Sequence, residues 1–194
     1  MEIDPNEIPS MYRTLSGAVV PRPIAWVSTT GEDGVDNLAP YSFFNVVSSA
    51  PPTLVFAPGD RPGGHTDTAR NAIDTGEFVV NVVDRAMAEA MNETSATLPR
   101  GESEFDHAGV EAAPSTRVRP PRVATSPVAF ECELTDFVEV GTGNVVFGEV
   151  VYVHVDDAVT TDGKVDATKL DAVGRLAGNY YCTTRDRFRM IRPD

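Results

Sequence analysis

The sequence contains very little lysine. Lys164 and Lys169 are its two lysines, and the other 14 basic residues are arginines. Acidic residues number 29, so the formal net charge at pH 7 is −13. This charge excludes nucleic acid as a main partner, because long polyanions are bound through many Lys and Arg contacts to phosphate. It also speaks against anionic membrane surfaces, so we expect neither nucleic acid nor a membrane as partner.

The same composition bears on the host cell. Few lysines and many carboxylates are typical of proteins from a salt-rich cytoplasm, where salt screens the repulsion between surface carboxylates. An ordinary acidic protein from a GC-rich genome, which favours arginine codons, would have the same composition. Our hypothesis is the first of these, a halophilic protein.

Cysteine is scarce as well. Cys132 and Cys182 are too few for a disulfide framework or a zinc site. Cys132 stands in a strand-like segment, where we expect a small buried hydrophobe. The first ten residues lack the basic and apolar regions of a signal peptide, and no apolar run approaches the roughly 18 residues of a membrane span. A reduced, cytoplasmic location is therefore the expectation.

Several motifs of catalysis are missing. The sequence has no P-loop, no HExxH, no GxSxG and no GxGxxG. The three histidines are scattered: His154 is expected to be a packed or rim residue of a strand, His107 lies in an irregular segment and keeps some chance of a role, and His65 stands alone. We predict no catalytic side chain and no metal site, so that any reactivity would come from a cofactor.

The apolar runs predict a mainly β fold. They are short, rich in Val, Phe and Tyr, and bounded by Gly, Pro, Asp and Asn. The run 35–47 carries Pro40 and is therefore an edge, a bulge or a break rather than a central strand. Six or more antiparallel strands favour a small β-barrel in a single domain, 1–194, over a parallel α/β sheet. The other expected strands lie in 18–30, 53–58, 77–83, 127–140 and 145–155, with turns at 31–34 and 141–144.

The clearest alternation lies in 127–140, which predicts a half-buried strand of a long hairpin. Its apolar face is expected to hold Val128, Phe130, Cys132, Leu134, Val138 and Val140. Its solvent face is expected to hold Glu131, Glu133, Thr135 and Glu139.

Helical character is limited to 67–75, 85–96 and a short piece near 102–108. The Pro- and Arg-rich stretch 98–126 is interpreted as an irregular excursion over the barrel that could cover a site.

The stretch 59–71 runs from a strand through Arg61 and two glycines into a helix. Thr66 is a candidate N-cap, and the free N–H groups of the first helical turn bind anions with help from the helix dipole. Arg61 and Arg70 could supply charge and Thr68 a hydroxyl, while Asp67 would repel a phosphate unless it caps backbone amides. An ordinary capped helix remains the alternative.

The segment 36–44 offers a surface for a flat ring. If Pro40 prevents a regular ladder, the neighbouring N–H groups become free to face a ligand, and Tyr41, Phe43 and Phe44 supply aromatic surface beside the hydroxyl of Ser42. A bulged strand with core aromatics is the alternative.

The C-terminal segment 170–194 combines turns with arginines. Gly174 and Gly178 flank Arg175, and Tyr180 and Tyr181 follow. Arginines in the tail either pair with acidic surface or gather an anionic cofactor or substrate. These arginines are Arg185, Arg187, Arg189 and Arg192.

Taken in order, these segments resemble the flavin reductase-like family of FMN-binding split-barrel proteins. The resemblance covers nearly the whole chain, and the ordered set is more specific than any one motif. The matching segments are 21–29, 37–44, 51–58, 66–71, 76–83, 104–110 and 174–181.

The resemblance implies a six-stranded Greek-key barrel that forms a homodimer, with FMN held noncovalently near the interface. It implies that the flavin ring lies on the turn from Asn37 through Ala39, Pro40, Tyr41 and Ser42 to Phe43. It implies a phosphate end at Thr66, Asp67, Thr68 and Asn71, with Arg61 nearby. It also places Arg22 and Ser28 at the cofactor cleft, and Arg175 with Tyr180 in the segment that closes over it. Many relatives carry a lysine where Thr66 stands, so the source of phosphate charge is an open question.

Three hypotheses follow. The first is an NAD(P)H-dependent, FMN-binding oxidoreductase, in which the flavin takes hydride from NADH or NADPH. The second is an FMN-binding electron carrier or store without such turnover. The third is a barrel-shaped interaction module without a cofactor. We expect small redox molecules as substrates and a second copy of the chain as partner.

Overall fold

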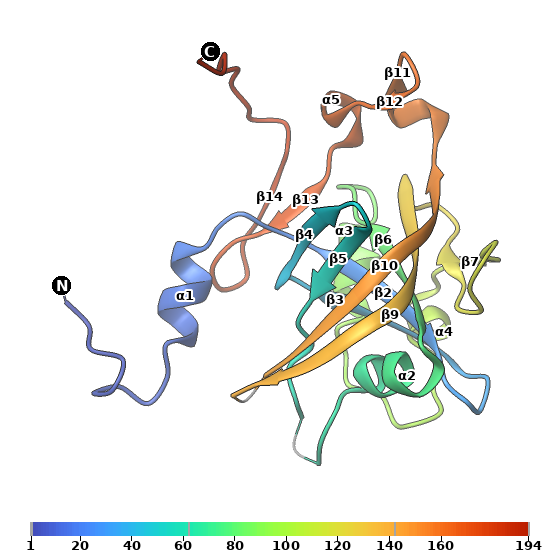
Figure 1. Ribbon diagram of the computed structural model, residues 1–194, viewed down its shortest axis with the longest axis horizontal. Coiled ribbons are helices and arrows are strands. Elements are labelled where there is room, and N and C mark those ends of the chain that lie inside the picture. Colours follow the sequence, from blue (N-terminus) through green and yellow to red (C-terminus); the bar gives the residue numbers. More distant parts are fainter. Residues whose placement is uncertain (1, 62, 142, 194) are drawn as a thin grey trace.

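One antiparallel sheet dominates the computed structural model, which describes residues 2–61, 63–141 and 143–193. Within these residues the sheet has seven strands in the order β3-β2-β6-β9-β10-β5-β4 (Figure 1). The mainly β fold predicted from the sequence is confirmed, and seven strands in the main sheet agree with the six or more that the apolar runs predicted. The strands are β2 (Ala25–Thr30), β3 (Asp36–Tyr41), β4 (Phe44–Ser49), β5 (Pro52–Phe56), β6 (Glu77–Val82), β9 (Val128–Val140) and β10 (Gly143–Val155).

The additional strand arises because the run 35–47 forms both β3 and β4, with a break at Ser42 and Phe43. Pro40 itself does not interrupt the ladder, since β3 stays in register with β2 as far as Tyr41, which lies opposite Ala25. An edge strand pairs on one side only, so it tolerates a residue without an N–H. The predicted edge position is therefore confirmed, whereas the predicted loss of the ladder at Pro40 is wrong.

Three hairpins of the described residues organise the sheet, and β4 and β5 form one of them. The turn predicted at 31–34 joins β2 to β3, with the Gly34 N–H donating to the Gly31 carbonyl at 3.0 Å. Strands β9 and β10 form a long hairpin that crosses the molecule diagonally (Figure 1). Its predicted turn at 141–144 includes Thr142, which lies outside the described residues.

Apolar clusters lie on both faces of the sheet. Successive residues of a strand point to opposite faces. Val27 accordingly joins Phe56 and Phe78 in one cluster, while Trp26 joins Leu38 in another. Cys132 belongs to the first cluster as a fully buried free thiol, as expected, and burial raises the pKa of this thiol.

The predicted alternation in β9 is partly wrong. Glu131 was expected to face solvent, but it is fully buried because residues 116–118 cover it. Val138 and Val140 were expected in the core but are exposed. The β9–β10 ladder shifts register between Phe147 and Gly148, and the hairpin end projects past the rest of the sheet (Figure 1).

The helices are short. α2 (Asp67–Thr75) matches the predicted segment, and Gly76 ends it with a φ of 74° in the left-handed region. α3 (Ala88–Glu93) is shorter than the predicted 85–96, and α4 (Glu104–Ala108) lies in the predicted 102–108. The sequence analysis missed α1 (Tyr12–Ala18), α5 (Ala167–Leu170) and the 3-10 turn η1 (Asp157–Val159). No helix in the described part of the chain is long and apolar enough to span a membrane.

Two segments lie outside the main sheet. The stretch 98–126 contains α4 and a small pair of strands, β7 (Ala112–Ala113) and β8 (Arg122–Val123). Near the C-terminus, β13 (Val173–Arg175) pairs with both β1 (Arg22–Pro23) and β14 (Tyr181–Thr183). β11 (Thr160–Thr161) and β12 (Lys164–Val165) form a separate short pair. The tail after β14 extends away from the sheet (Figure 1).

Candidate functional site

A small basic cavity lies at the beginning of α2. Thr66 is the N-cap predicted from the sequence, and its Oγ1 accepts a hydrogen bond from the Ala69 N–H at 3.3 Å. The cavity has a volume of about 250 Å³. Its described lining includes Arg61, Arg70 and Arg100, with Asp67 as the acidic residue. Helix N-termini and arginines both favour oxyanions, so this cavity has the chemistry of a phosphate site.

The three arginines are not equivalent. Arg70 is already engaged, since it donates to Asp67 Oδ1 at 2.7 Å and to the His65 carbonyl at 3.0 Å. Arg61 and Arg100 make no ion pair with any carboxylate of the described residues. These two side chains therefore carry the charge that a phosphate would meet. Arg100 was missed by the sequence analysis because it lies 30 residues beyond Arg70, in the Pro-rich stretch 98–126.

Polar side chains line the sheet next to this cavity. Asn37 of β3 donates to Thr68 Oγ1 at 2.8 Å, and both residues are buried. The Tyr41 phenol lies beside the hydroxyls of Thr68 and Thr66. Burial raises the pKa of Tyr41, although the two threonine hydroxyls and the Arg61 charge act in the opposite direction. Tyr41 is therefore a neutral hydrogen-bonding group whose phenol reaches the start of α2 from the last residue of β3.

Glu104 of α4 fixes the outer edge of β3. Its Oε2 accepts the Leu38 N–H at 3.0 Å, so this edge donor is not free for a ligand. The side chain is buried, and burial raises the pKa of its carboxyl above the usual range. The Leu38 N–H lowers this pKa, the nearby Asp67 charge raises it and Arg61 lowers it. Glu104 thus holds the strand that carries the predicted ring segment.

Asn71 does not join the basic cavity. Its amide donates to Thr29 Oγ1 at 3.1 Å and ties α2 to β2. It lines a neighbouring cavity whose described residues include the acids Glu32, Asp33 and Asp74 as well as Arg70 and Arg100. The structure therefore places Asn71 in a cavity that shares Asp67, Arg70 and Arg100 with the cavity at the start of α2, whereas Arg61 and Thr66 line the latter cavity alone.

Arg22 connects three segments beside Ser42. Its Nη1 donates to the carbonyls of Ser16 and Val19 at 2.5 and 2.6 Å, and its Nη2 to that of Leu176 at 3.1 Å. Its Nε donates to Ser42 Oγ at 3.4 Å, and its guanidinium lies 5.8 Å from the Phe43 ring centroid. Arg22 is 7% exposed, so it positions the turn between β3 and β4 more than it offers a free surface.

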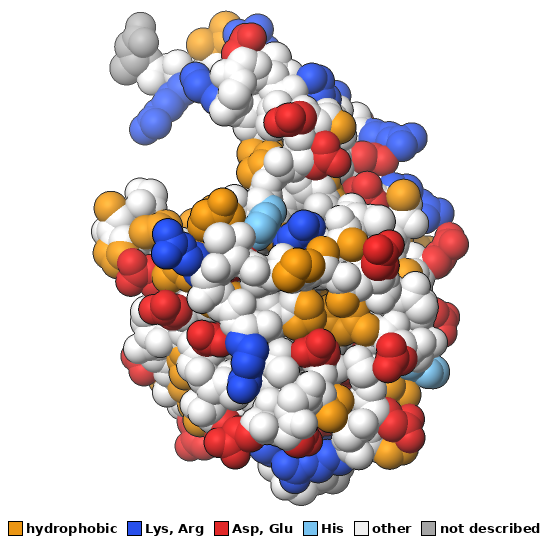
Figure 2. Space-filling model, turned by 90° about the vertical axis from the view of Figure 1, so that its right-hand side faces the viewer, with side chains coloured by type: hydrophobic (Ala, Val, Ile, Leu, Met, Phe, Trp, Pro, Cys, Tyr) orange, Lys and Arg blue, Asp and Glu red, His pale blue; other side chains and the backbone are white. Residues whose placement is uncertain are grey.

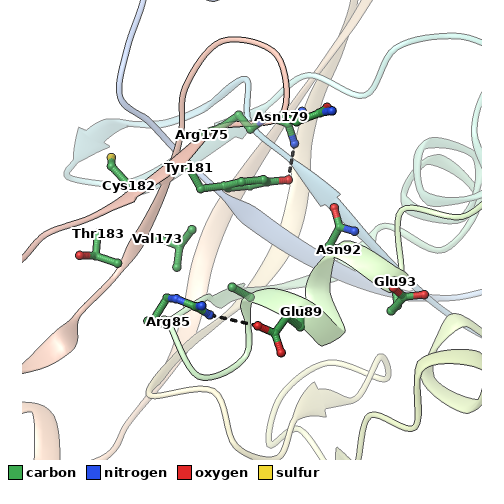
Figure 3. A pocket seen from close by; sticks show the side chains of 11 residues that line it. Arg85, Glu89, Asn92, Glu93, Val173, Arg175, Asn179, Tyr181, Cys182 and Thr183 are labelled. Carbon is green, nitrogen blue, oxygen red and sulfur yellow. Dashed lines mark hydrogen bonds and ion pairs between the residues drawn. The ribbon is translucent and has the colours of Figure 1, made fainter.

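Arg175 and Tyr181 form one wall of a larger cavity of about 780 Å³ between β13–β14 and α3. The Arg175 guanidinium lies 4.5 Å from the Tyr181 ring centroid and donates to its hydroxyl. Figure 3 shows this pair facing Arg85 and Glu89 across the cavity. Tyr180, which was predicted to act with Arg175, is 75% exposed instead. Alternation in the β14 hairpin turns Tyr181 inward, and the sequence alone gave no means of choosing between the two tyrosines.

Ser28 does not face a cleft. It is fully buried, donates to the Pro121 carbonyl at 2.5 Å and receives a hydrogen bond from Asn81 at 3.3 Å. The predicted position at the cofactor cleft is therefore wrong for its side chain, because residues after the β7 strand pack over it. Ala39 and Pro40 remain half-buried on β3, as an exposed edge requires.

The site combines two cavities beside β3. Arg61, Arg100 and the start of α2 line one of them, and Ser42 and Arg22 line the other. Two arginines without carboxylate partners fit a phosphate, and the half-buried aromatic turn fits a flat ring. The fold and the site therefore define a small antiparallel barrel suited to a flat, phosphate-bearing ligand.

The comparison with known proteins agrees with this class. The model of the flavin reductase-like domain matches residues 16–171, and the chain belongs to that family. The chain is similar to the solved nitrilotriacetate monooxygenase component B from Bacillus cereus, with 35% identity, a TM-score of 0.94 and 98% of both chains covered.

It is also similar to the 2-nitrobenzoate 2-nitroreductase of Pseudomonas fluorescens, with 34% identity and a TM-score of 0.91, over 100% of this chain and 96% of that one. A split-barrel structure from Shewanella frigidimarina shares the fold at 24% identity and a TM-score of 0.86, with 100% of both chains covered. The split-barrel fold predicted from the sequence is confirmed.

Proposed function

We propose that this protein is an FMN-dependent oxidoreductase that takes hydride from NADH or NADPH. The observation that carries the proposal is the cavity at the start of α2, where Arg61 and Arg100 form no ion pair with a carboxylate of the described residues. In a chain with a net charge of −13, two such arginines beside a helix N-terminus favour a phosphate strongly. Family membership supports flavin as the group that bears it.

The chain's residues divide the work of binding. Arg61, Arg100 and the first N–H groups of α2 hold the phosphate end. Tyr41 and Thr68 offer hydroxyls along β3, and Ser42 and Phe43 meet the ring. Glu104 and Arg22 do not bind but hold the two ends of the ring segment in place.

When bound, the flavin supplies the acceptance of hydride and its release to an acceptor. The chain's part is to orient the ring and to place N–H groups and positive charge around it. This division agrees with the absence of a nucleophile–base motif from the sequence.

A spectrum of the purified protein tests the proposal. Absorption near 450 nm, or saturable quenching of added FMN fluorescence, is expected, followed by oxidation of NADH or NADPH that depends on FMN. A colourless protein that takes up no FMN would rule the proposal out. Side-by-side rates with NADH and NADPH identify the donor.

The second candidate function is an FMN-binding electron carrier or store. It rests on the same binding residues, and the rate of hydride uptake distinguishes the two. A yellow protein that oxidises NADH and NADPH no faster than free FMN would favour the carrier.

We also infer that two copies of the chain associate. Apolar side chains are exposed at two places, with Leu15 on α1 and Val19 at its C-cap, and with Val46 and Val47 on β4. Exposed apolar patches of this kind mark association surfaces. Sedimentation should give about twice the mass of 20.9 kDa, and a monomer at micromolar concentration would contradict this inference.

A further inference from the structure

A second basic cavity lies between α1, the turn at Ser42 and the loop after β13. Its volume is about 650 Å³, which is in the range of small-molecule sites. The residues that line it include Arg13, Arg22 and Arg175, together with Ser16 and Ser42. No Asp or Glu of the described residues is among them.

The three arginines of this cavity keep their positive charge uncompensated. Arg22 is bound by three backbone carbonyls and one hydroxyl, all of them neutral. Arg175 donates to the Tyr181 hydroxyl and to the Gly178 carbonyl, which are also neutral. None of the three forms an ion pair with a carboxylate of the described residues. Three such charges converging on one cavity favour an anion.

The charge elsewhere on the molecule makes this concentration unusual. Figure 2 shows acidic side chains scattered among separate basic ones over one face of the molecule, so the surface there has no single sign. The cavity beside α2 that contains Asn71 is lined by several acids. A cavity with arginines and no acid therefore stands out on a chain with a net charge of −13.

Aromatic side chains border the same cavity. Tyr12 lines it and is 66% exposed, and the Phe43 ring lies under the Arg22 guanidinium and is 45% exposed. Exposed rings beside arginines bind flat ligands through stacking, while the arginines hold a charged group.

We propose that this cavity binds a flat aromatic ligand through a carboxylate or phosphate group, and that this ligand is the substrate that exchanges electrons with the flavin. The oxyanion lies between Arg13 and Arg175, and Arg22 positions both walls through Ser16, Leu176 and Ser42. Ser42 also belongs to the ring segment, so the aromatic part of the ligand meets the flavin there. This last step rests on the proposed function, whereas binding of the anion does not.

Calorimetric titration of the full-length protein tests the anion site directly. Benzoate is the carboxylate probe with benzamide as its neutral match, and adenosine 5′-monophosphate is the phosphate probe with adenosine as its match. At least one charged probe should bind, and its neutral match should bind at least tenfold more weakly. The probe that binds more tightly identifies the oxyanion. Equal binding of charged and neutral members in both pairs, or no binding of either acid, would overturn the proposal.

Charge reversal locates the site. Arg13 makes no side-chain hydrogen bond within the described residues and is exposed, so Arg13→Glu leaves the fold intact. For the charged probe that the wild-type protein binds, the dissociation constant of the Arg13→Glu variant should be at least tenfold higher than that of the wild type. Arg117→Glu is the matched control, since the Arg117 side chain is exposed and lines none of these cavities, and it should change the constant less than twofold. Equal changes in the two variants would mean that only the global charge matters.

An FMN titration of the same samples separates the two proposals. If the wild-type protein binds FMN but neither acid, the proposed anion site is refuted and the proposed function stands. If the protein binds benzoate or the nucleotide but no FMN, the proposed function is refuted and the proposed anion site stands.

Discussion

His154 Nε2 lies 2.6 Å from Glu131 Oε1, which joins a partly exposed histidine of β10 to a fully buried carboxylate of β9. The same carboxylate accepts the N–H groups of Thr116, Arg117 and Val118 at 2.7, 2.5 and 3.2 Å. Burial acts to raise the pKa of Glu131, but these donors outweigh it and hold the pKa below the usual range. One side chain of the sheet therefore fixes the middle of the stretch 98–126.

Glu131→Gln should destabilise the protein by about 2–3 kcal/mol at pH 7, because an amide cannot accept all four hydrogen bonds and its NH₂ group opposes a donor. The native pKa is lowered, so the contribution of the carboxylate is complete above the unfolded value of 4.5 and is lost as pH falls through the native pKa. Urea unfolding should show the difference at pH 7 and a smaller one in acid. Tryptic cleavage after Arg117 should accelerate, and an unchanged cleavage rate would show that other contacts hold the stretch.

Glu104→Gln should have the opposite pH dependence. The amide oxygen can still accept the Leu38 N–H, but no charge is buried. Because the native pKa is raised, the cost of ionising Glu104 appears as pH rises above 4.5 and is complete above the native pKa. The variant should be more stable than the parent at pH 8, with the gap closing towards pH 4. Thermal melts across this range measure it, and a gap that widens in acid would contradict the assignment.

Arg61→Ala combined with Arg100→Ala should separate FMN from riboflavin. If the cavity at α2 holds the phosphate, the dissociation constant for FMN should rise at least tenfold, while that for riboflavin should change little. Fluorescence quenching measures both. Arg117→Ala removes the same kind of charge outside the cavity and should leave both constants unchanged. Equal losses for FMN and riboflavin in the double variant would place the phosphate elsewhere.

Gly148→Ala should destabilise the sheet by about 2–3 kcal/mol through overpacking. A Cβ at this position would lie 2.2 Å from Cζ of Phe78, a fully buried ring with no room to move. Gly59→Ala is the matched control, because no atom lies within 4 Å of its Cβ position. Chemical unfolding of both variants should show a lower free energy of unfolding for Gly148→Ala and an unchanged one for Gly59→Ala. A Gly148→Ala protein as stable as the parent would mean that β10 can shift locally.

Low salt should lower the melting temperature. With a net charge of −13, repulsion between surface carboxylates grows as the Debye length rises from about 3 Å at 1 M salt to about 10 Å at 0.1 M. Scanning calorimetry after dialysis across this range measures the change. An unchanged melting temperature with full folding would contradict the halophilic hypothesis.

The sequence predicted those elements whose signals are local. Thr66 and Gly76 mark the ends of α2, and the turn at 31–34 contains the glycine that its geometry requires. The mainly β class followed from short apolar runs between turn residues. α1 was missed because its N-cap residue, Met11, has no side chain that can cap a helix, and its apolar residues are largely exposed.

Features that depend on packing between distant segments could not be predicted from the sequence. Glu131 obeys the alternation of a half-exposed strand, but a segment 13 to 15 residues earlier covers it with N–H donors. Ser28 is buried for the same kind of reason, under Pro121. Arg100 lines the cavity at α2 because of the course of an irregular stretch of chain, and such a stretch has no periodic sequence pattern from which its course can be predicted. In each case the deciding neighbour comes from a different element.

Arg22 joins the two ends of the chain into one cooperative unit. Its guanidinium holds carbonyls of the helix near the N-terminus and of Leu176, 154 residues further along, so neither segment can detach without leaving a buried cation with fewer acceptors. Amide hydrogen exchange in α1 and in the loop after β13 should therefore slow or quicken together. Removal of the first 18 residues would then increase the mobility of the loop after β13, which lies near the other end of the chain.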